Sequence, residues 1–308
     1  MISALPLPNP FELTFMQRAL IAGVVVGAFA PMIGTFLVQK RMSLIGDGIG
    51  HLAFAGVGAG LLAAVSTGAD PRSSSLPVWM ALVFAVAGAL GIEWLRSRRR
   101  ASGDLALALF FYSGIALGVV LVSSAQSLNA ITTYLFGSPL TASAADVRLI
   151  VLLGAVIIGA ILATRRALFA VVADEEWSSV ARLPVGLLNS LLAILTACAV
   201  VVAMKIVGIL LIAAMMVLPV ASGQLLARSF RGTLAWSAGV GMIAAVVGLA
   251  AARVWDLAPS GSIVLVSAIV FAIVAIATRG RGSGILSRDD ELIEGSTAMV
   301  LDDSQPER

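Results

Sequence analysis

Residues 39–60 read QKRMSLIGDGIGHLAFAGVGAG, a basic pair followed by an apolar run that holds one aspartate and one histidine. Asp47 and His51 are four residues apart, so on a helix they share one face with about 5–6 Å between their Cβ atoms. Carboxylate and imidazole are both common metal ligands. Because ionisable groups inside a membrane are costly, they usually face a bundle interior or an aqueous path. We therefore expect a metal-ion site at Asp47 and His51.

The composition indicates that this stretch belongs to a membrane protein. Of the 308 residues, 59% are hydrophobic and 12% are charged, and the mean hydropathy is +1.03. Apolar runs long enough to cross a hydrocarbon core of about 30 Å recur along the chain. The first run lacks the basic segment and cleavage site of a secretory signal, so we expect it to be retained. The predicted fold is an all-α, polytopic transmembrane helical bundle that forms one domain, residues 1–278.

Nine spans are predicted, with eight as the alternative. The stretch 124–145 is too polar to span and is expected to form a short helix at the outer face. The predicted spans are 15–38, 44–66, 77–95, 104–123, 146–164, 184–204, 208–227, 233–253 and 260–278.

The basic residues predict the orientation of the bundle. Fifteen of the twenty Lys and Arg residues fall in connections or ends on one side of the predicted membrane. By the positive-inside rule that side is cytoplasmic, so the N-terminus is expected outside and the C-terminus inside. The five basic residues on the other side are Arg18, Arg72, Arg148, Lys205 and Arg253.

The sequence lacks several common nucleotide-binding and catalytic motifs, which limits the functions that the chain can have. The chain has no GxxxxGK[ST] phosphate loop, no HExxH and no GxSxG, so we expect a transport protein rather than an enzyme, without an ATPase site of its own. The single cysteine, Cys198, excludes an intramolecular disulfide. The sequence pI of 9.6 does not indicate a nucleic-acid partner, because no recognisable nucleic-acid module accompanies the basic clusters.

A polar insertion, ADEEWSSVARLPVG at residues 173–186, interrupts the later spans. Asp174 and Glu175 suit a helix N-terminus, and Pro184 ends or kinks the helix. Two interpretations stay open: an amphipathic helix parallel to the membrane, or a docking element for a cytoplasmic partner. Residues 279–308 are expected to be a solvated, partly disordered cytoplasmic tail.

Glycines and one proline indicate breaks or close packing along the path. Gly46, Gly48 and Gly50 alternate through the first stretch, and each lowers helix stability by up to about 1 kcal/mol relative to alanine. They favour a broken or re-entrant entry to the second span, as is common at transport sites. Breaks or close approaches are likewise expected at Gly56, Gly208 and Pro219.

Residues 39–60 resemble the permeases of bacterial zinc and manganese ABC importers. Further resemblances lie in the outer LFG of residues 135–137, in AMKIVG at 203–208 with the following LLIAAMMVLPVA, and at Pro259 with Gly261. The residues of the first stretch that match the family's pattern are Lys40, Arg41, Met42, Ser43, Asp47, His51 and Gly56.

The resemblance implies a mechanism and partners. Such permeases are expected in the plasma membrane as dimers, with a cytoplasmic ATP-binding subunit on each chain and an extracytoplasmic metal-binding protein. The imported zinc or manganese is cargo, and no permanent cofactor is expected. Two copies of Asp47 and His51 would then supply four ligands. The insertion at 173–186 resembles the coupling helix that contacts the ATPase, with the coupling residues Asp174, Glu175, Arg182 and Gly186.

One departure concerns the metal. Some zinc-type members have a second histidine about where Tyr112 stands here. A carboxylate with a single imidazole also suits manganese or iron, because harder cations accept more oxygen ligands. Two alternatives to the importer site stay open: a proton-coupled secondary metal transporter, and an Asp47 that only hydrogen-bonds His51 and fixes helix packing.

Overall fold

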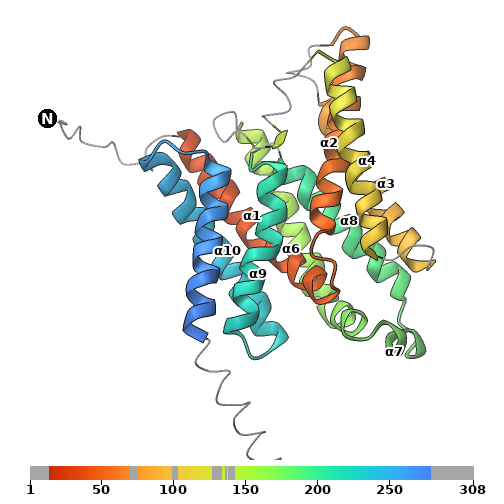
Figure 1. Cartoon of the computed structure of the whole chain (residues 1–308), viewed down its shortest axis with the longest axis vertical. Helices are drawn as coiled ribbons and strands as arrows, with labels where there is room; N and C mark the ends of the chain where they lie inside the picture. The colour runs from red at the N-terminus through yellow and green to blue at the C-terminus, as the bar shows by residue number, and fades with distance from the viewer. Residues whose placement is uncertain are drawn as a thin grey trace, which may run out of the picture.

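The computed structural model describes residues 14–69, 75–98, 103–126, 134–135, 137, 143–204 and 206–278, and within these ranges the regular structure is helical (Figure 1). The predicted all-α membrane bundle is thereby confirmed. The helices are α1 Thr14–Gln39, α2 Ile45–Ser66, α3 Leu76–Ser97, α4 Gly103–Ser124, α6 Ala144–Ala173, α7 Glu175–Val180, α8 Val185–Met204, α9 Ile209–Leu226, α10 Phe230–Val254 and a last helix, Pro259–Thr278. The tail at 279–308 and Phe136 of the LFG motif lie outside the described residues.

Each of the nine predicted spans corresponds to a helix. Within the described residues, eight helices are long and apolar enough to cross a membrane. The predicted span 208–227 is α9, whose 18 residues rise about 27 Å. The predicted span 146–164 was too short, because α6 continues to Ala173. Pro259 and Gly261 lie in the first turn of the last helix.

Helix α2 is continuous from Ile45 to Ser66, so the prediction of a broken or re-entrant entry is wrong for this structure. The glycines of α2 allow close packing instead. A Cβ at Gly46 would lie 2.9 Å from Met216 Sδ, and one at Gly48 would lie 2.6 Å from Leu107. The packing of neighbouring helices against these positions therefore outweighs the weak helix propensity of glycine.

Helix α2 is the centre of its half of the bundle and packs against α3, α4, α8 and α9. Helix α3 approaches closely at Gly56, where a Cβ would lie 2.5 Å from the Met80 carbonyl oxygen and 2.6 Å from Ala81 Cα of α3. A Cβ at Gly50 would lie 2.5 Å from a side-chain methyl group of Ile209 of α9. Packing this close leaves α2 little room to shift against α3 and α9.

The break between α8 and α9 lies at Gly208, which has φ 88°. Gly137 of the LFG motif packs directly onto this connection, since a Cβ there would lie 2.6 Å from Gly208 N. Pro219 lies inside α9 without ending it. Of the two positions, only Gly208 interrupts a helix.

The helix connections alternate between two sides of the bundle. In Figure 1, α7 and the connections α1–α2 and α9–α10 lie toward the lower side of the view, whereas the end of α2 and the start of α9 lie toward the upper side. The start of α2, which carries Asp47, therefore lies on the same side as α7.

We predict that Gly56→Ala lowers the stability of the folded protein by about 1–3 kcal/mol, because the added methyl group meets backbone atoms that cannot rotate away. The matched control is Gly159→Ala in α6, where a Cβ meets no atom within 4 Å. That change is expected to be neutral or stabilising. The midpoint of thermal unfolding in detergent measures both, and equal midpoints for the two variants would contradict the close packing of α2.

Candidate functional site

Asp47 and His51 lie together in the first two turns of α2. Asp47 is in the first turn of the helix, and His51 Nε2 lies 3.7 Å from Asp47 Oδ1. The His51 residue is 8% exposed, whereas the Asp47 side chain keeps 29% of its surface. A buried imidazole and a more open carboxylate that face each other can contact one cation between them.

The 3.7 Å separation bears on the purely structural alternative. It is too long for a hydrogen bond, so the pair does not fix helix packing through one in this conformation. Within the described residues, the glycine contacts already hold α2 in place. The oxygen and nitrogen lone pairs therefore remain available to a ligand.

Helix α4 covers His51. The Phe111 ring meets the imidazole edge to face, with centroids 4.5 Å apart and an interplanar angle of 78°. Gly114 of α4 lets the backbones approach, since a Cβ there would lie 3.0 Å from the carbonyl carbon of His51. Tyr112 is 70% exposed, so the side chain against His51 comes from the residue before the expected histidine position.

A single chain offers a small set of ligands. Among the described residues, no three His, Cys, Asp or Glu side chains gather closely enough to hold a metal ion. The pair thus supplies one nitrogen and up to two oxygens. Structural zinc sites use four protein ligands, so the pair by itself suits a site that a cation enters and leaves.

The predicted element at 173–186 contains the short helix α7. Asp174 is its N-cap, and its carboxylate accepts a hydrogen bond of 2.8 Å from the Trp177 backbone N–H. Arg182 follows the helix in a left-handed conformation, with φ 59°, and Gly186 lies in the first turn of α8. Both Arg182 and Gly186 are exposed and stay apart from the polar contacts made by Glu175.

Glu175 joins α7 to three other parts of the bundle. Its carboxylate accepts two hydrogen bonds of 3.1 Å from the Arg96 guanidinium of α3 and one of 2.9 Å from the Asn189 amide of α8. Lys40 Nζ, in the α1–α2 connection, lies 4.0 Å from Glu175 Oε2 and donates a hydrogen bond to Asn189 Oδ1. Arg96 is held in turn by Glu93 at 2.7 and 3.0 Å. We call these five side chains the Glu175 network.

Sequence reasoning missed most of this network. The sequence indicates Lys40 only as part of the basic pair in the family pattern and Arg96 only as one of the basic residues that determine orientation, and Asn189 belongs to no recognised pattern. One signal was available: Glu93 and Arg96 have the i, i+3 spacing of a helical ion pair. The contacts of Lys40 and Arg96 with Glu175 join segments far apart in sequence, and no local pattern predicts them.

Burial and neighbouring charges set the ionisation of Lys40 and Glu175, the two members of the network that lie outside the spans. Burial lowers the pKa of Lys40, and Arg96 lowers it further, against the opposing effect of Glu175 and Glu93. Burial alone would raise the pKa of Glu175, but the hydrogen bonds and charges of Arg96, Lys40 and Asn189 outweigh it and lower that pKa. Glu175 is therefore an ionised acceptor at neutral pH.

Known proteins resemble this chain along most of its length. The manganese transport system membrane protein MntC of Listeria monocytogenes is 28% identical over 92% of this chain and 97% of its own. MntC of Halalkalibacterium halodurans is 30% identical over 84% of this chain and 86% of its own. The structure described as PsaBC from Streptococcus pneumoniae in complex with Fab matches with a TM-score of 0.74 and 31% identity, over 85% of this chain and 91% of that one.

One known protein family matches the whole helical bundle of this chain. The ABC 3 transport family matches residues 12–278, which include every helix described above. The resemblance seen in residues 39–60 is thereby confirmed, as is the expected multi-pass location in the plasma membrane. The chain belongs to the ABC 3 transport family of membrane permeases.

Proposed function

We propose that this chain is the membrane-spanning permease subunit of a binding-protein-dependent ABC importer that carries a divalent transition-metal ion into the cytoplasm. The observation that carries the proposal is the pair of Asp47 and His51, held 3.7 Å apart in the closely packed helix α2. The family match supports the transport role. The orientation that places the N-terminus outside and α7 in the cytoplasm rests on the positive-inside rule.

Manganese is the cargo that the site favours, with zinc and iron as the other candidates. Several relatives are described as manganese transport or import proteins. The chemistry agrees, because a carboxylate and a single imidazole offer mostly oxygen, which manganese accepts more readily than zinc does. Phe111 occupies the space beside His51 and supplies no second nitrogen.

A second copy of the chain would complete the site. Two pairs of Asp47 and His51 around a shared axis supply two carboxylates and two imidazoles, enough for four-coordinate binding. A metal site whose ligands come from both chains opens when one chain moves relative to the other. The ion is then released without breaking the bundle of either chain.

The energy would come from a separate subunit. The chain has no phosphate loop, and its family is one of ABC transporters. Near α7, the large apolar side chains of Trp177, Val180 and Leu187 are exposed. An exposed apolar helix of this kind suits a groove on a cytoplasmic ATP-binding subunit, and we assign residues 173–186 this coupling role. An extracytoplasmic metal-binding protein would deliver the ion.

The Glu175 network gives the coupling a physical route. Movement of α7 pulls on Glu175, which is tied to Lys40 directly and through Asn189. Lys40 lies in the connection that leads into α2, a few residues before Asp47. A shift of α7 by the ATPase therefore reaches the start of α2, where the metal ligands lie.

We predict that Asp47→Asn and His51→Ala each lower ATP-dependent manganese uptake into cells by at least about tenfold, because each removes a ligand of the transported ion. Asp104→Asn is the matched control, since Asp104 is an exposed aspartate in the first turn of the neighbouring helix α4. Membrane expression is quantified for every variant.

Two outcomes would refute this assignment. Wild-type uptake by well-expressed Asp47 and His51 variants would remove the pair from the path. Uptake that continues after ATP depletion and stops with a protonophore would support the proton-coupled alternative, in which Asp47 carries the coupling proton.

We predict that Glu175→Gln and Arg96→Gln each uncouple ATP hydrolysis from transport, and that the double variant is no worse than either single one. The reason is that both changes break the same contact, so their effects are not additive. The measurement is the ratio of ATP hydrolysed to manganese moved in vesicles that contain the complete transporter. Independent, additive losses would show that Glu175 does not act through Arg96.

A further inference from the structure

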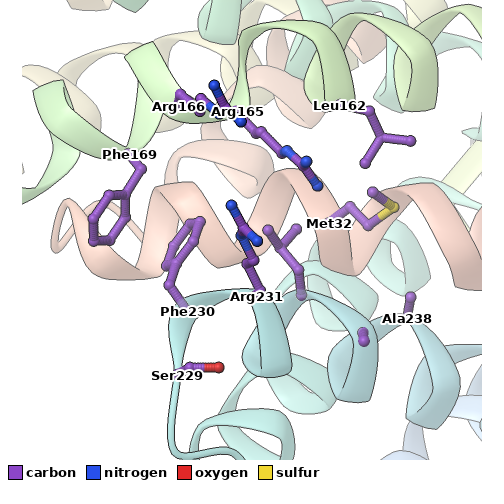
Figure 2. Close-up of a pocket in the computed structure, with 11 residues that line it drawn as sticks. Met32, Leu162, Arg165, Arg166, Phe169, Ser229, Phe230, Arg231 and Ala238 are labelled. Atoms are coloured by element: carbon purple, nitrogen blue, oxygen red, sulfur yellow. The ribbon is translucent and has the colours of Figure 1, made fainter.

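A cavity of about 620 Å³ lies between α1, α6 and α10, away from Asp47 and from the Glu175 network. Figure 2 shows its walls: Leu162 and Phe169 come from α6, Phe230 from α10 and Met32 from α1. Its volume is in the range of pockets that hold organic ligands, about 300–1,000 Å³. Leu162 is 47% exposed and Phe169 is 43% exposed, so the apolar wall is open to the surroundings of the bundle.

Three arginines line the same cavity. In Figure 2, Arg165 extends from α6 and Arg231 from α10 toward the space between the two helices, and Arg166 lies beside Arg165. The residues that line the cavity include no Asp or Glu. Within the described part of the chain, these arginines form no ion pair, in contrast to Arg96 with its two carboxylates. The cavity thus combines apolar walls with three positive charges for which the described residues supply no counter-ion.

The start of α10 adds to this positive field. Ser229 is the N-cap of α10 and lines the cavity, and its hydroxyl accepts a hydrogen bond of 3.1 Å from the Gly232 N–H. The N-terminus of a 25-residue helix carries a partial positive charge that favours anions. The helix terminus and the arginines therefore point to the same kind of ligand, one with a negative group.

The length of α6 gives the depth of the arginines in the membrane. Arg165 lies about 32 Å along the helix from Ala144, close to the thickness of a hydrocarbon core, about 30 Å. The remaining residues to Ala173 continue beyond it. If Ala144 lies at one membrane surface, Arg165 and Arg166 lie at the level of the opposite headgroups, which the proposed orientation makes the cytoplasmic leaflet.

We infer that this cavity binds an anionic phospholipid of the cytoplasmic leaflet. The phosphate would contact Arg165 and Arg231 near the start of α10, and an acyl chain would lie against Leu162 and Phe169. A small soluble anion would leave the exposed apolar wall without a contact. A zwitterionic lipid carries no net charge, so it would not neutralise the arginines. The bound lipid would join α6, which leads into α7, to α1 and α10.

The test uses the purified full chain in a neutral detergent, with phosphatidylglycerol and phosphatidylcholine as probes. The variant Arg165→Gln/Arg231→Gln removes two cavity charges. Its control, Arg148→Gln/Arg253→Gln, removes two exposed charges from the opposite ends of the same two helices, α6 and α10. Thermal unfolding is measured with each lipid and with inorganic phosphate at equal ionic strength.

Phosphatidylglycerol is expected to raise the unfolding midpoint of the wild type and the control by about 2–4 °C more than phosphatidylcholine does. The cavity variant is expected to lose that difference. An equal difference in all three proteins, or an equal rise with inorganic phosphate, would overturn the inference.

Native mass spectrometry of the wild type provides a readout that does not depend on the variants. From an equimolar mixture of the two lipids, the protein is expected to retain phosphatidylglycerol preferentially. Equal retention, or occupation of the cavity by a second copy that the Arg165→Gln/Arg231→Gln change releases as monomer, would contradict a lipid site.

Discussion

The structure depends on the close approach of other helices to α2. Glycines on this helix let α3 and α9 come within contact distance of its backbone, and Gly114 lets α4 pack against the backbone of His51. A helix enclosed in this way has little freedom to tilt or unwind by itself. Asp47 and His51 are consequently held at a fixed separation, as the proposed transport site requires. Side chains larger than hydrogen at these positions would open gaps between the helices and loosen the pair of Asp47 and His51.

The Glu175 network connects this rigid element to the part of the protein that is expected to move. Partly buried charges are stable only when they are paired and hydrogen-bonded, and Glu175 is satisfied by partners from α3, α8 and the α1–α2 connection. Breaking one contact leaves the others partly uncompensated, so the five side chains respond together. A short helix with an exposed apolar surface and an inward-facing carboxylate can thus bind a partner and transmit its motion.

The sequence predicted the class of fold, the positions of the spans and the helix after Asp174, because hydropathy and capping are local signals. The four-residue spacing of Asp47 and His51 also predicted that their side chains lie on one face of a helix. The prediction of a break in α2 was wrong. It rested on the weak helix propensity of glycine, whereas the contacts of Gly46 and Gly48 with other helices keep α2 continuous. The Glu175 network and the arginine-lined cavity join residues that are distant in sequence, so only the folded chain reveals them.

The most direct test of a shared metal site is pulsed electron paramagnetic resonance of Mn²⁺ bound to the purified protein. His51 is the only histidine in the chain, so ¹⁵N-histidine labelling, with a purification tag that lacks histidine, marks one position per subunit. The account predicts hyperfine coupling from imidazole nitrogen, with one Mn²⁺ bound per two chains and the coupling lost in His51→Ala. Bound Mn²⁺ without ¹⁵N coupling, or a coupling that persists in His51→Ala, would contradict it.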